Sequence, residues 1–397
     1  MSAIVVGLLF GFLILLITNP SQAVPGFLKI VTGAVDHGMP GIGKVLYFAT
    51  PIMMTGLSVG FAFKTGLFNI GTPGQFFMGA YGAVYIGILF PQLGAVHWVV
   101  ALLVAILFGA LWALLPGILK AFFNVNEVIS SIMMNYIGMY LVNFMVKNNA
   151  GLFDQLRNQT KLVPSSAVIP KMGLDKLFPG STANGGFLIA ILVVIIIYIV
   201  LNKTTFGFEL KAVGFNRDAS KYAGINEKRS IVLSMLIAGG IAGLGGGLLY
   251  LAGSGKYIEV VDVLAGEGFT GISVALLGLS NPIGVALSAI FIAYITEGGF
   301  YMQTLNFVPE IIDIIVAVII YFSAFALIIK TLMNKRSKKR EMKALDAQTS
   351  ADNEVKMEQV TNALPDDTPE SEESILPISD TPDENELIED NKKEGGN

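Results

Sequence analysis

The sequence contains no cysteine and only two histidines, His37 and His97. The absence of cysteine excludes a disulfide framework, a thiolate metal site and a cysteine nucleophile. Two isolated histidines without an HExxH pattern do not make a histidine-rich metal centre. We therefore expect no catalytic site, no metal and no other cofactor in this chain.

Charged residues are scarce. They make up 14% of the 397 residues, whereas hydrophobic residues make up 53%. A typical soluble domain carries about a quarter of its residues as charged side chains. This composition argues against a soluble enzyme, a disordered protein and a nucleic-acid-binding protein. It predicts an all-α polytopic membrane protein.

Apolar runs of the length needed to cross a bilayer, about 20 residues, recur along the chain. We predict about ten transmembrane helices, within a range of eight to ten. The predicted spans are residues 3–18, 46–63, 73–90, 96–119, 128–146, 185–201, 230–251, 263–279, 282–298 and 311–332.

Basic residues set the expected orientation, because Lys and Arg concentrate in cytoplasmic connections. They cluster in residues 335–343 and in the loop 202–229. We therefore place both termini in the cytoplasm, the connection 147–184 outside the cell, and the protein in the plasma membrane. Residues 21–23, Ser-Gln-Ala, could instead end a cleaved signal peptide, but no Lys or Arg precedes the first apolar run, which favours a retained helix.

Three parts follow from the charge distribution: a transmembrane domain at 1–334, a basic juxtamembrane segment at 335–343, and an acidic tail at 344–397. The tail holds 3 basic and 16 acidic residues, whereas residues 1–343 hold 23 and 14. The tail has no aromatic residue, so we expect it to be disordered in the cytoplasm. The basic segment is suited to contact anionic membrane lipids.

Truncation after Lys343 should leave membrane insertion and activity largely intact, because the tail has little apolar surface to add to a core. Activity should stay within about tenfold of the full chain, or roughly 1.4 kcal/mol on an equilibrium scale. A larger loss in an activity assay would assign the tail a structural or regulatory role.

Two glycine-containing segments resemble nucleotide-binding loops without matching them. Residues 253–256, Gly-Ser-Gly-Lys, lack the first glycine and the final Ser or Thr of a P-loop, so this chain should have no ATPase site of its own. Gly239, Gly243 and Gly247 recur every four residues within an apolar run. That spacing predicts close packing against a neighbouring helix.

Several polar residues fall within the predicted spans. Ser131 and Asn135 lie within about 80° of Glu127 on a helical wheel, so they face either a water-filled path or a neighbouring helix. Gln75 is expected to complete a capping box with Thr72, and Glu127 to do the same with Asn124. Gly266 and Gly268 flank Glu267, and Gly298 and Gly299 follow Glu297. Glycines beside an acidic residue are typical of broken helices that line a cavity.

Three segments together resemble a known family. They are residues 56–76 (GLSVGFAFKTGLFNIGTPGQF), residues 126–137 (NEVISSIMMNYI), and residues 207–214 with 223–226 (GFELKAVG and AGIN). They resemble permease subunits of nucleoside ABC importers, within the branched-chain amino acid and sugar permease superfamily. The resemblance covers about residues 45–330.

This resemblance implies a ten-helix importer fold that pairs with ATPase subunits, which bind the ATP, and with a second, related permease. It also implies an extracellular lipid-anchored binding protein that delivers nucleosides. Since a nucleoside is neutral and bears hydroxyl groups, we expect its path to involve Gln75, Phe76, Ser131, Asn135 and Glu267. The charged loop 203–228 is expected to couple to the ATPase through Glu209, Lys211, Gly214, Arg217 and Asp218.

Other functions remain open at this point. The chain could be an importer permease for simple sugars or branched-chain amino acids. It could also be an ion-coupled secondary transporter, with Glu267, Glu297 and Asp313 as proton relays. A membrane-embedded enzyme is disfavoured because no nucleophile–base pair is evident. Co-purification of ATPase chains would separate an importer subunit from a carrier that works alone.

Overall fold

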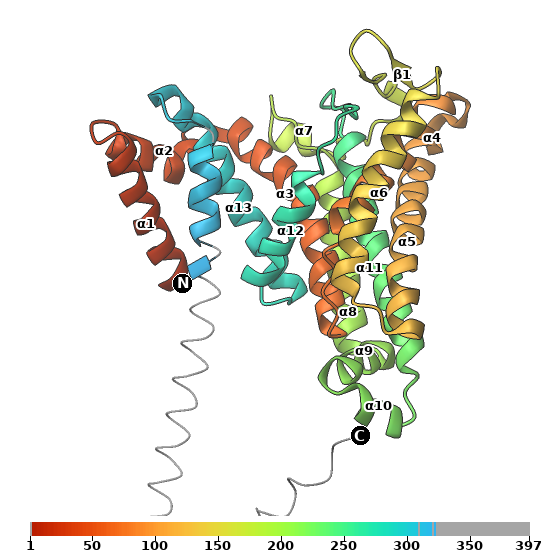
Figure 1. Ribbon diagram of the computed structural model, residues 1–397. Helices are drawn as coiled ribbons and strands as arrows, with labels where there is room; N and C mark the ends of the chain where they lie inside the picture. Colours follow the sequence, from red (N-terminus) through yellow and green to blue (C-terminus); the bar gives the residue numbers. More distant parts are fainter. Residues whose placement is uncertain (1, 309, 320, 323–397) are drawn as a thin grey trace, which may run out of the picture. The chain divides into compact units, whose positions relative to one another are not determined.

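The computed structural model describes residues 2–308, 310–319 and 321–322, which form a bundle of helices (Figure 1). The predicted basic segment 335–343 and the predicted acidic tail 344–397 lie outside these residues. Most of the second half of the predicted span 311–332 does so as well.

The longer helices account for most of the described chain. They are α1 (Ser2–Thr18), α2 (Ala23–Asp36), α3 (Gly38–Lys64), α4 (Thr72–Leu89), α5 (His97–Phe123), α6 (Glu127–Lys147), α8 (Gly186–Lys203), α11 (Glu227–Tyr250), α12 (Gly266–Leu277) and α13 (Pro282–Met302). Residues 310–319 are also helical.

Shorter elements lie in the connections. They are α7 (Leu174–Leu177), α9 (Thr205–Phe215), α10 (Arg217–Tyr222), and the 3-10 turns η1 (Pro91–Val96), η2 (Ser165–Ala167) and η3 (Gln303–Leu305). The predicted all-α fold needs one addition. Strands β1 (Phe153–Asp154) and β2 (Gln159–Thr160) form an antiparallel pair, because the connection 147–184 is long enough to satisfy its own backbone groups in a hairpin.

Six helices in the described part are long and apolar enough to cross a membrane: α3, α5 with η1, α6, α8, α11 and α13 with η3. The helices α1 and α12 are apolar but shorter. The helical, polytopic character is therefore as predicted, and the count of about ten spans stays a prediction.

The N-terminal part differs from the sequence prediction. Helix α2 was not predicted, because Pro25, Lys29 and Asp36 interrupt its apolar residues. Its apolar face nevertheless packs against α13. Helix α3 begins at Gly38, eight residues before the predicted span 46–63. Lys44 therefore lies within a helix, and an ion pair offsets the cost of its charge there.

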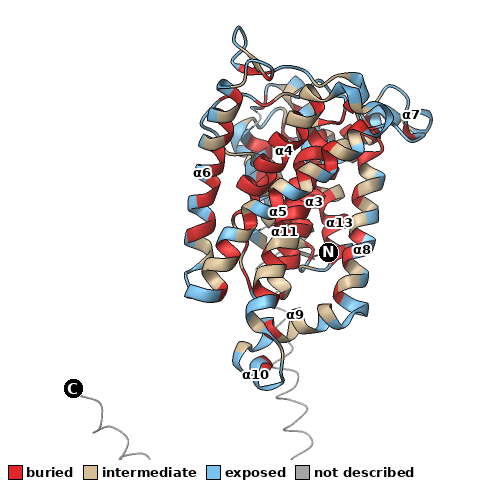
Figure 2. Cartoon of the chain, turned by 90° about the vertical axis from the view of Figure 1, so that its right-hand side faces the viewer, coloured by how far each residue is buried: buried red, intermediate tan, exposed pale blue. Residues whose placement is uncertain are grey.

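Helix α11 is the centre of the bundle and packs against α3, α4 and α5. Every residue from Ala238 to Leu249 is buried, and Figure 2 shows buried residues concentrated on these central helices. Gly243 faces Gly79 of α4 and Gly109 of α5, so the three backbones approach closely. Gly239 and Gly247 also face α5, and the glycine spacing thus lies on the helix face that makes this contact.

The outer faces of α5 and α8 are apolar. On α5, exposed leucines recur every four residues at Leu103, Leu107, Leu111 and Leu115. Leu188, Leu192, Ile195 and Ile199 form a similar exposed stripe on α8. Stripes of this kind are suited to contact acyl chains and not water.

The two predicted loops lie at opposite ends of the bundle. Helices α9 and α10 form one end, and α7 with the β1–β2 hairpin forms the other (Figure 1). Helix α8 connects the two ends. The loop 202–229 and the connection 147–184 therefore lie on opposite sides of any membrane that α8 crosses.

Candidate functional site

A buried polar turn joins α3 to α4. The side-chain amides of Asn69 and Gln75 exchange two hydrogen bonds, each of 2.9 Å, and both side chains are buried. The hydroxyl of Thr72 donates to the Asn69 backbone oxygen at 3.0 Å. The predicted capping box is therefore wrong. Helix α4 begins at Thr72 itself, and the Gln75 side-chain amide is hydrogen-bonded to Asn69 instead of capping the helix.

Helix α6 adds two of the predicted path residues to this turn. Asn135 donates from Nδ2 to the Ile70 oxygen at 3.0 Å and accepts at Oδ1 from the Gly74 N–H at 2.9 Å. Ser131 is fully buried, and its hydroxyl has no hydrogen-bond partner among the described residues. Asn135 thus makes the bonds to a neighbouring element that one of the two alternatives expected. Its placement on a substrate path stays a prediction.

The start of α6 also differs from the predicted cap. Asn126, and not Asn124, is the N-cap, since its side chain accepts from the Val128 N–H at 2.9 Å. Asn124 instead ends α5 in a left-handed conformation, with φ of 52°. Glu127 is consequently the first residue of α6, where it pairs with Lys120 at 2.9 Å.

Phe76 lies in the contact between α4 and α11 and is fully buried. Its backbone oxygen and ring lie against Gly246 and Gly245 respectively. The missing side chains of these two glycines make room for the phenyl ring and for the backbone of α4. In this subunit Phe76 contributes to packing, and its place on a path stays a prediction.

Glu267 is placed on an open cavity. It lies in the first turn of α12, 3.5 Å from the Lys256 ammonium. Its backbone oxygen accepts a hydrogen bond of 2.8 Å from Thr55 of α3. Glu267, Lys256 and Asp313 all line a cavity of about 290 Å³. Sequence reasoning named both acidic residues, but it did not pair Glu267 with Lys256.

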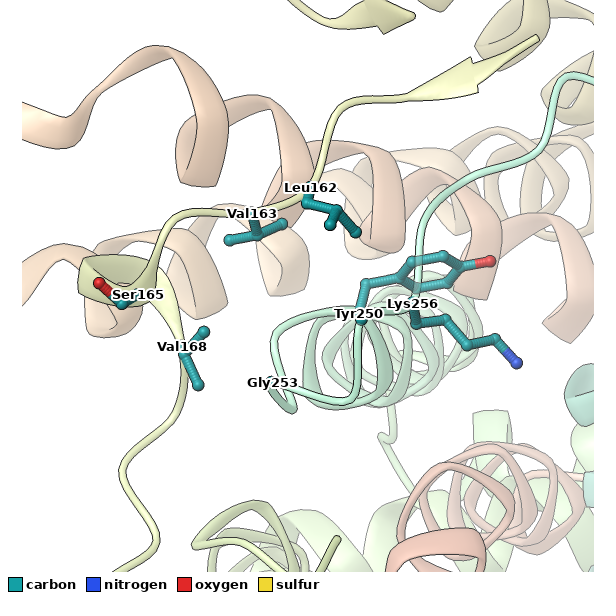
Figure 3. Close-up of a pocket in the computed structure, with 8 residues that line it drawn as sticks. Leu162, Val163, Ser165, Val168, Tyr250, Gly253 and Lys256 are labelled. Carbon is teal, nitrogen blue, oxygen red and sulfur yellow. The ribbon is translucent and has the colours of Figure 1, made fainter. Parts of the chain in front are cut away.

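Lys256 also lines a second cavity, of about 230 Å³. Leu162, Val163 and Val168, in the segment after β2, face Tyr250 at the end of α11 (Figure 3). The walls are mostly apolar. The Lys256 ammonium points away from the wall formed by Ser165 and Val168 (Figure 3). Lys256 is therefore shared by two cavities at this end of α11.

The buried acidic residue Glu297 is paired within the bundle. Its carboxylate lies 3.5 Å from the Lys44 ammonium, which also lies over the Tyr301 ring at 5.5 Å. The His37 ring stacks on the same Tyr301 ring, with a distance of 3.6 Å between the ring centroids. This cluster connects α3 to α13. Removal of Lys44 would leave the buried charge of Glu297 without compensation.

The predicted coupling loop folds into α9 and α10. Gly214 in α9 packs against the residues that follow α3: a methyl group there would overlap the Lys64 carbonyl oxygen and lie 2.9 Å from the Gly66 nitrogen. Only a glycine allows this backbone-to-backbone contact. The loop is thus held directly against the end of α3.

Charged and aromatic side chains surround this contact. Arg217 forms a two-point ion pair with Glu227 of α11, at 2.7 and 3.4 Å. Glu209, Lys211 and Asp218 form no ion pair with another described residue. Sequence reasoning considered charge and missed the aromatic residues: Phe215 and Tyr222 are 90% and 94% exposed. An amphipathic pattern on two short helices would have been the signal.

Comparison with known proteins places this geometry in context. The chain matches the family "Branched-chain amino acid transport system / permease component" over residues 41–324. No solved structure matches the chain.

The alignments with curated relatives cover most of the length of each relative. The chain is 39% identical to the guanosine ABC transporter permease protein NupP of Bacillus subtilis, over 85% of this chain and 95% of the relative. It is 36% identical to the nucleoside ABC transporter permease protein NupB of Lactococcus lactis, over 84% and 92%. It is 31% identical to the glucose ABC transporter permease protein TsgB13 of Haloferax volcanii, over 71% and 75%.

Proposed function

This chain belongs to the family of permease components of branched-chain amino acid transport systems, and on that premise we propose that the substrate it carries is a nucleoside. The observation that carries the proposal is the identity of 39% and 36% to permeases named for guanosine and for nucleosides, each covering at least 84% of this chain. The resemblance of residues 56–76 and 126–137 to the nucleoside branch supports the same substrate.

A sugar is the second candidate. The relative named for glucose is 31% identical and covers 71% of this chain. Uptake of labelled guanosine, other nucleosides, glucose and leucine by cells that express the complete system separates the candidates. Uptake of one or more nucleosides without glucose or leucine supports the proposal, and uptake of glucose without nucleosides contradicts it.

The proposed assembly contains two ATPase subunits that bind the ATP, a second related permease and an extracellular lipid-anchored binding protein. In it, both termini of this chain and the α9–α10 end lie in the cytoplasm, and the chain has about ten spans and no ATPase site of its own.

Co-purification in mild detergent tests the assembly, because an ion-coupled carrier would be isolated alone. Reporter fusions after residues 160 and 216 test the orientation.

The α9–α10 end is the proposed docking surface for an ATPase subunit. Phe215→Ala should reduce co-purification of that subunit at least fivefold, and Tyr222→Ala should act in the same direction. Burial of a large apolar side chain contributes about 1.5–3 kcal/mol, and both rings are free to be buried by a partner. Quantitative pull-down from detergent measures the effect.

Leu156→Ala is the matched control. Leu156 is 99% exposed between β1 and β2. This hairpin lies at the opposite end of the bundle from α9 and α10 (Figure 1), so removal of the leucine side chain should not change ATPase recovery. Equal recovery with Phe215→Ala, Tyr222→Ala and Leu156→Ala would place the docking surface elsewhere.

A further inference from the structure

We propose that the cavity between α3, α12, α13 and the helical residues 310–319 is a binding site for the nucleoside during its passage. In this site the carboxylates of Glu267 and Asp313 accept hydrogen bonds from the ribose hydroxyl groups. This inference rests on the proposed function. The sequence-based prediction also named Glu267 for the path, but together with Gln75, Phe76, Ser131 and Asn135 and without Asp313.

The first step is the shape and lining of the cavity. Its volume of about 290 Å³ lies close to the lower end of ligand-site volumes, roughly 300–1,000 Å³. One wall is apolar, with Phe48, Pro51 and Ile52 from α3 and Leu249 from α11. Such a wall suits the flat face of a nucleobase.

The lining also carries polar groups: Lys256, the α12 residues Glu267 and Thr270, Thr296 from α13, and Asp313. Ile292, Ala293 and Val316 add apolar surface beside them. Carboxylates accept hydrogen bonds and the hydroxyl groups of a ribose donate them, so adjacent hydroxyls and a carboxylate are complementary. An apolar surface beside groups that accept hydrogen bonds from hydroxyls therefore fits the base and the ribose of a nucleoside.

The second step concerns the unused bonding capacity of these groups. The Glu267 carboxylate and the Lys256 ammonium are 3.5 Å apart, which leaves both partly available to a ligand. Asp313 is exposed and forms no ion pair within the described part of the chain. By contrast, the amides of Asn69, Gln75 and Asn135 are satisfied inside the subunit.

The third step is the cost of exposing these charges to lipid. A charged side chain at membrane depth costs about 2.5–3.5 kcal/mol on insertion scales and usually faces a water-filled cavity. Thr296 lies within an apolar span, and it shares the cavity with Asp313. The face that carries them is therefore the face of this subunit that water reaches, unlike the leucine stripe on α5.

The position along the bundle also fits an entry site. Helix α11 starts beside α10 and ends at Tyr250, so Leu249 and Lys256 lie near the end opposite α9 and α10. In the proposed orientation this is the side where a binding protein would release its nucleoside. Sharing Glu267 with Lys256 would keep the affinity low enough for release, which passage requires.

Cysteine accessibility tests the site, because the chain has no native cysteine. Thr270→Cys and Thr296→Cys, each in the complete complex in proteoliposomes, should react with a charged, water-soluble methanethiosulfonate at least tenfold faster than the control Leu107→Cys. Leu107 lies on the exposed apolar stripe of α5. Saturating guanosine should slow both reactions at least threefold, and glucose should not.

The outcomes separate this inference from the proposed function. Rates equal to that of Leu107→Cys with and without ATP, in complexes that still import guanosine, would overturn the site. Fast labelling without guanosine protection, in complexes that import guanosine, would overturn nucleoside binding there. If the unaltered complex imports no nucleoside, the proposed function fails, and fast labelling would then show only an aqueous cavity and overturn its assignment to a nucleoside.

A second readout addresses the ribose directly. Asp313→Asn and Glu267→Gln should reduce the preference for guanosine over 3′-deoxyguanosine in uptake, from at least fivefold in the unaltered complex to less than twofold. The binding protein is the same in every variant, so a change in this ratio reports on the permease. An unchanged ratio in both variants would overturn the role of the carboxylates.

Discussion

Gly243→Ala should reduce the yield of folded protein to less than a tenth of the unaltered level. A methyl group at this position would overlap the Ala105 carbonyl oxygen and lie 2.9 Å from the Cα atom of Gly109. Both obstacles are backbone atoms, which cannot move aside as a side chain can. Overpacking typically costs about 1–3 kcal/mol, and a rigid three-helix crossing should be at or above the upper end.

Gly240→Ala provides a matched control on the same helix. The nearest atom to a methyl group at Gly240 is Cγ2 of Ile106, at 3.2 Å, and a rotation of that side chain can make room. Size-exclusion chromatography after a series of heating steps would give yield and thermal stability together. Similar values for both variants would mean that the α4–α5–α11 crossing tolerates separation.

The features predicted well from sequence are those determined by local patterns. Long apolar runs marked the helices, since crossing a bilayer requires about 20 apolar residues. The four-residue spacing of Gly239, Gly243 and Gly247 predicted a close helix contact, and these glycines lie against α5. The predicted span 282–298 begins at Pro282, which is also the first residue of α13, and Asn281 caps this helix through the Ile283 N–H.

Other features depend on partners that are remote in the sequence. Glu297 meets Lys44 across more than half of the chain, and no spacing rule relates the two positions. Helix α2 is too short, and its apolar residues are too interrupted, to be recognised as a span alone, but it packs against α13. Pairwise contacts of this kind become visible only once the helices are placed.

The polar residues of α6 illustrate a more specific limit. A helical wheel correctly put Ser131 and Asn135 near one another, but it gives a direction and not the neighbour in that direction. The neighbour is the turn after α3, where the Ile70 oxygen and the Gly74 N–H bind Asn135. Both an aqueous path and an interhelical contact predict a polar stripe, so the sequence could not choose between them.

Gly214→Val should reduce uptake at least tenfold while the protein still inserts in the membrane and still binds its ATPase subunits. The added atoms would overlap the Lys64 carbonyl oxygen and push α9 away from the end of α3. Helix α3 extends from this contact to Phe48, Pro51 and Ile52 on the proposed nucleoside cavity. Displacing α9 therefore interrupts a direct connection, through α3, between the proposed ATPase docking surface and the proposed nucleoside cavity.

The decisive measurement is the number of nucleosides imported per ATP hydrolysed in proteoliposomes that contain the complete complex. Complexes that carry Gly214→Val should hydrolyse ATP, through their ATPase subunits, at a rate that no longer rises when loaded binding protein is added. Ala219→Val is the control for added bulk on the same proposed docking surface, since Ala219 is exposed on α10 and lies outside the contact of Gly214 with the end of α3. Unchanged stimulation in Gly214→Val would show that movement reaches the cavity without the α9–α3 contact, through the Arg217–Glu227 pair and α11 instead.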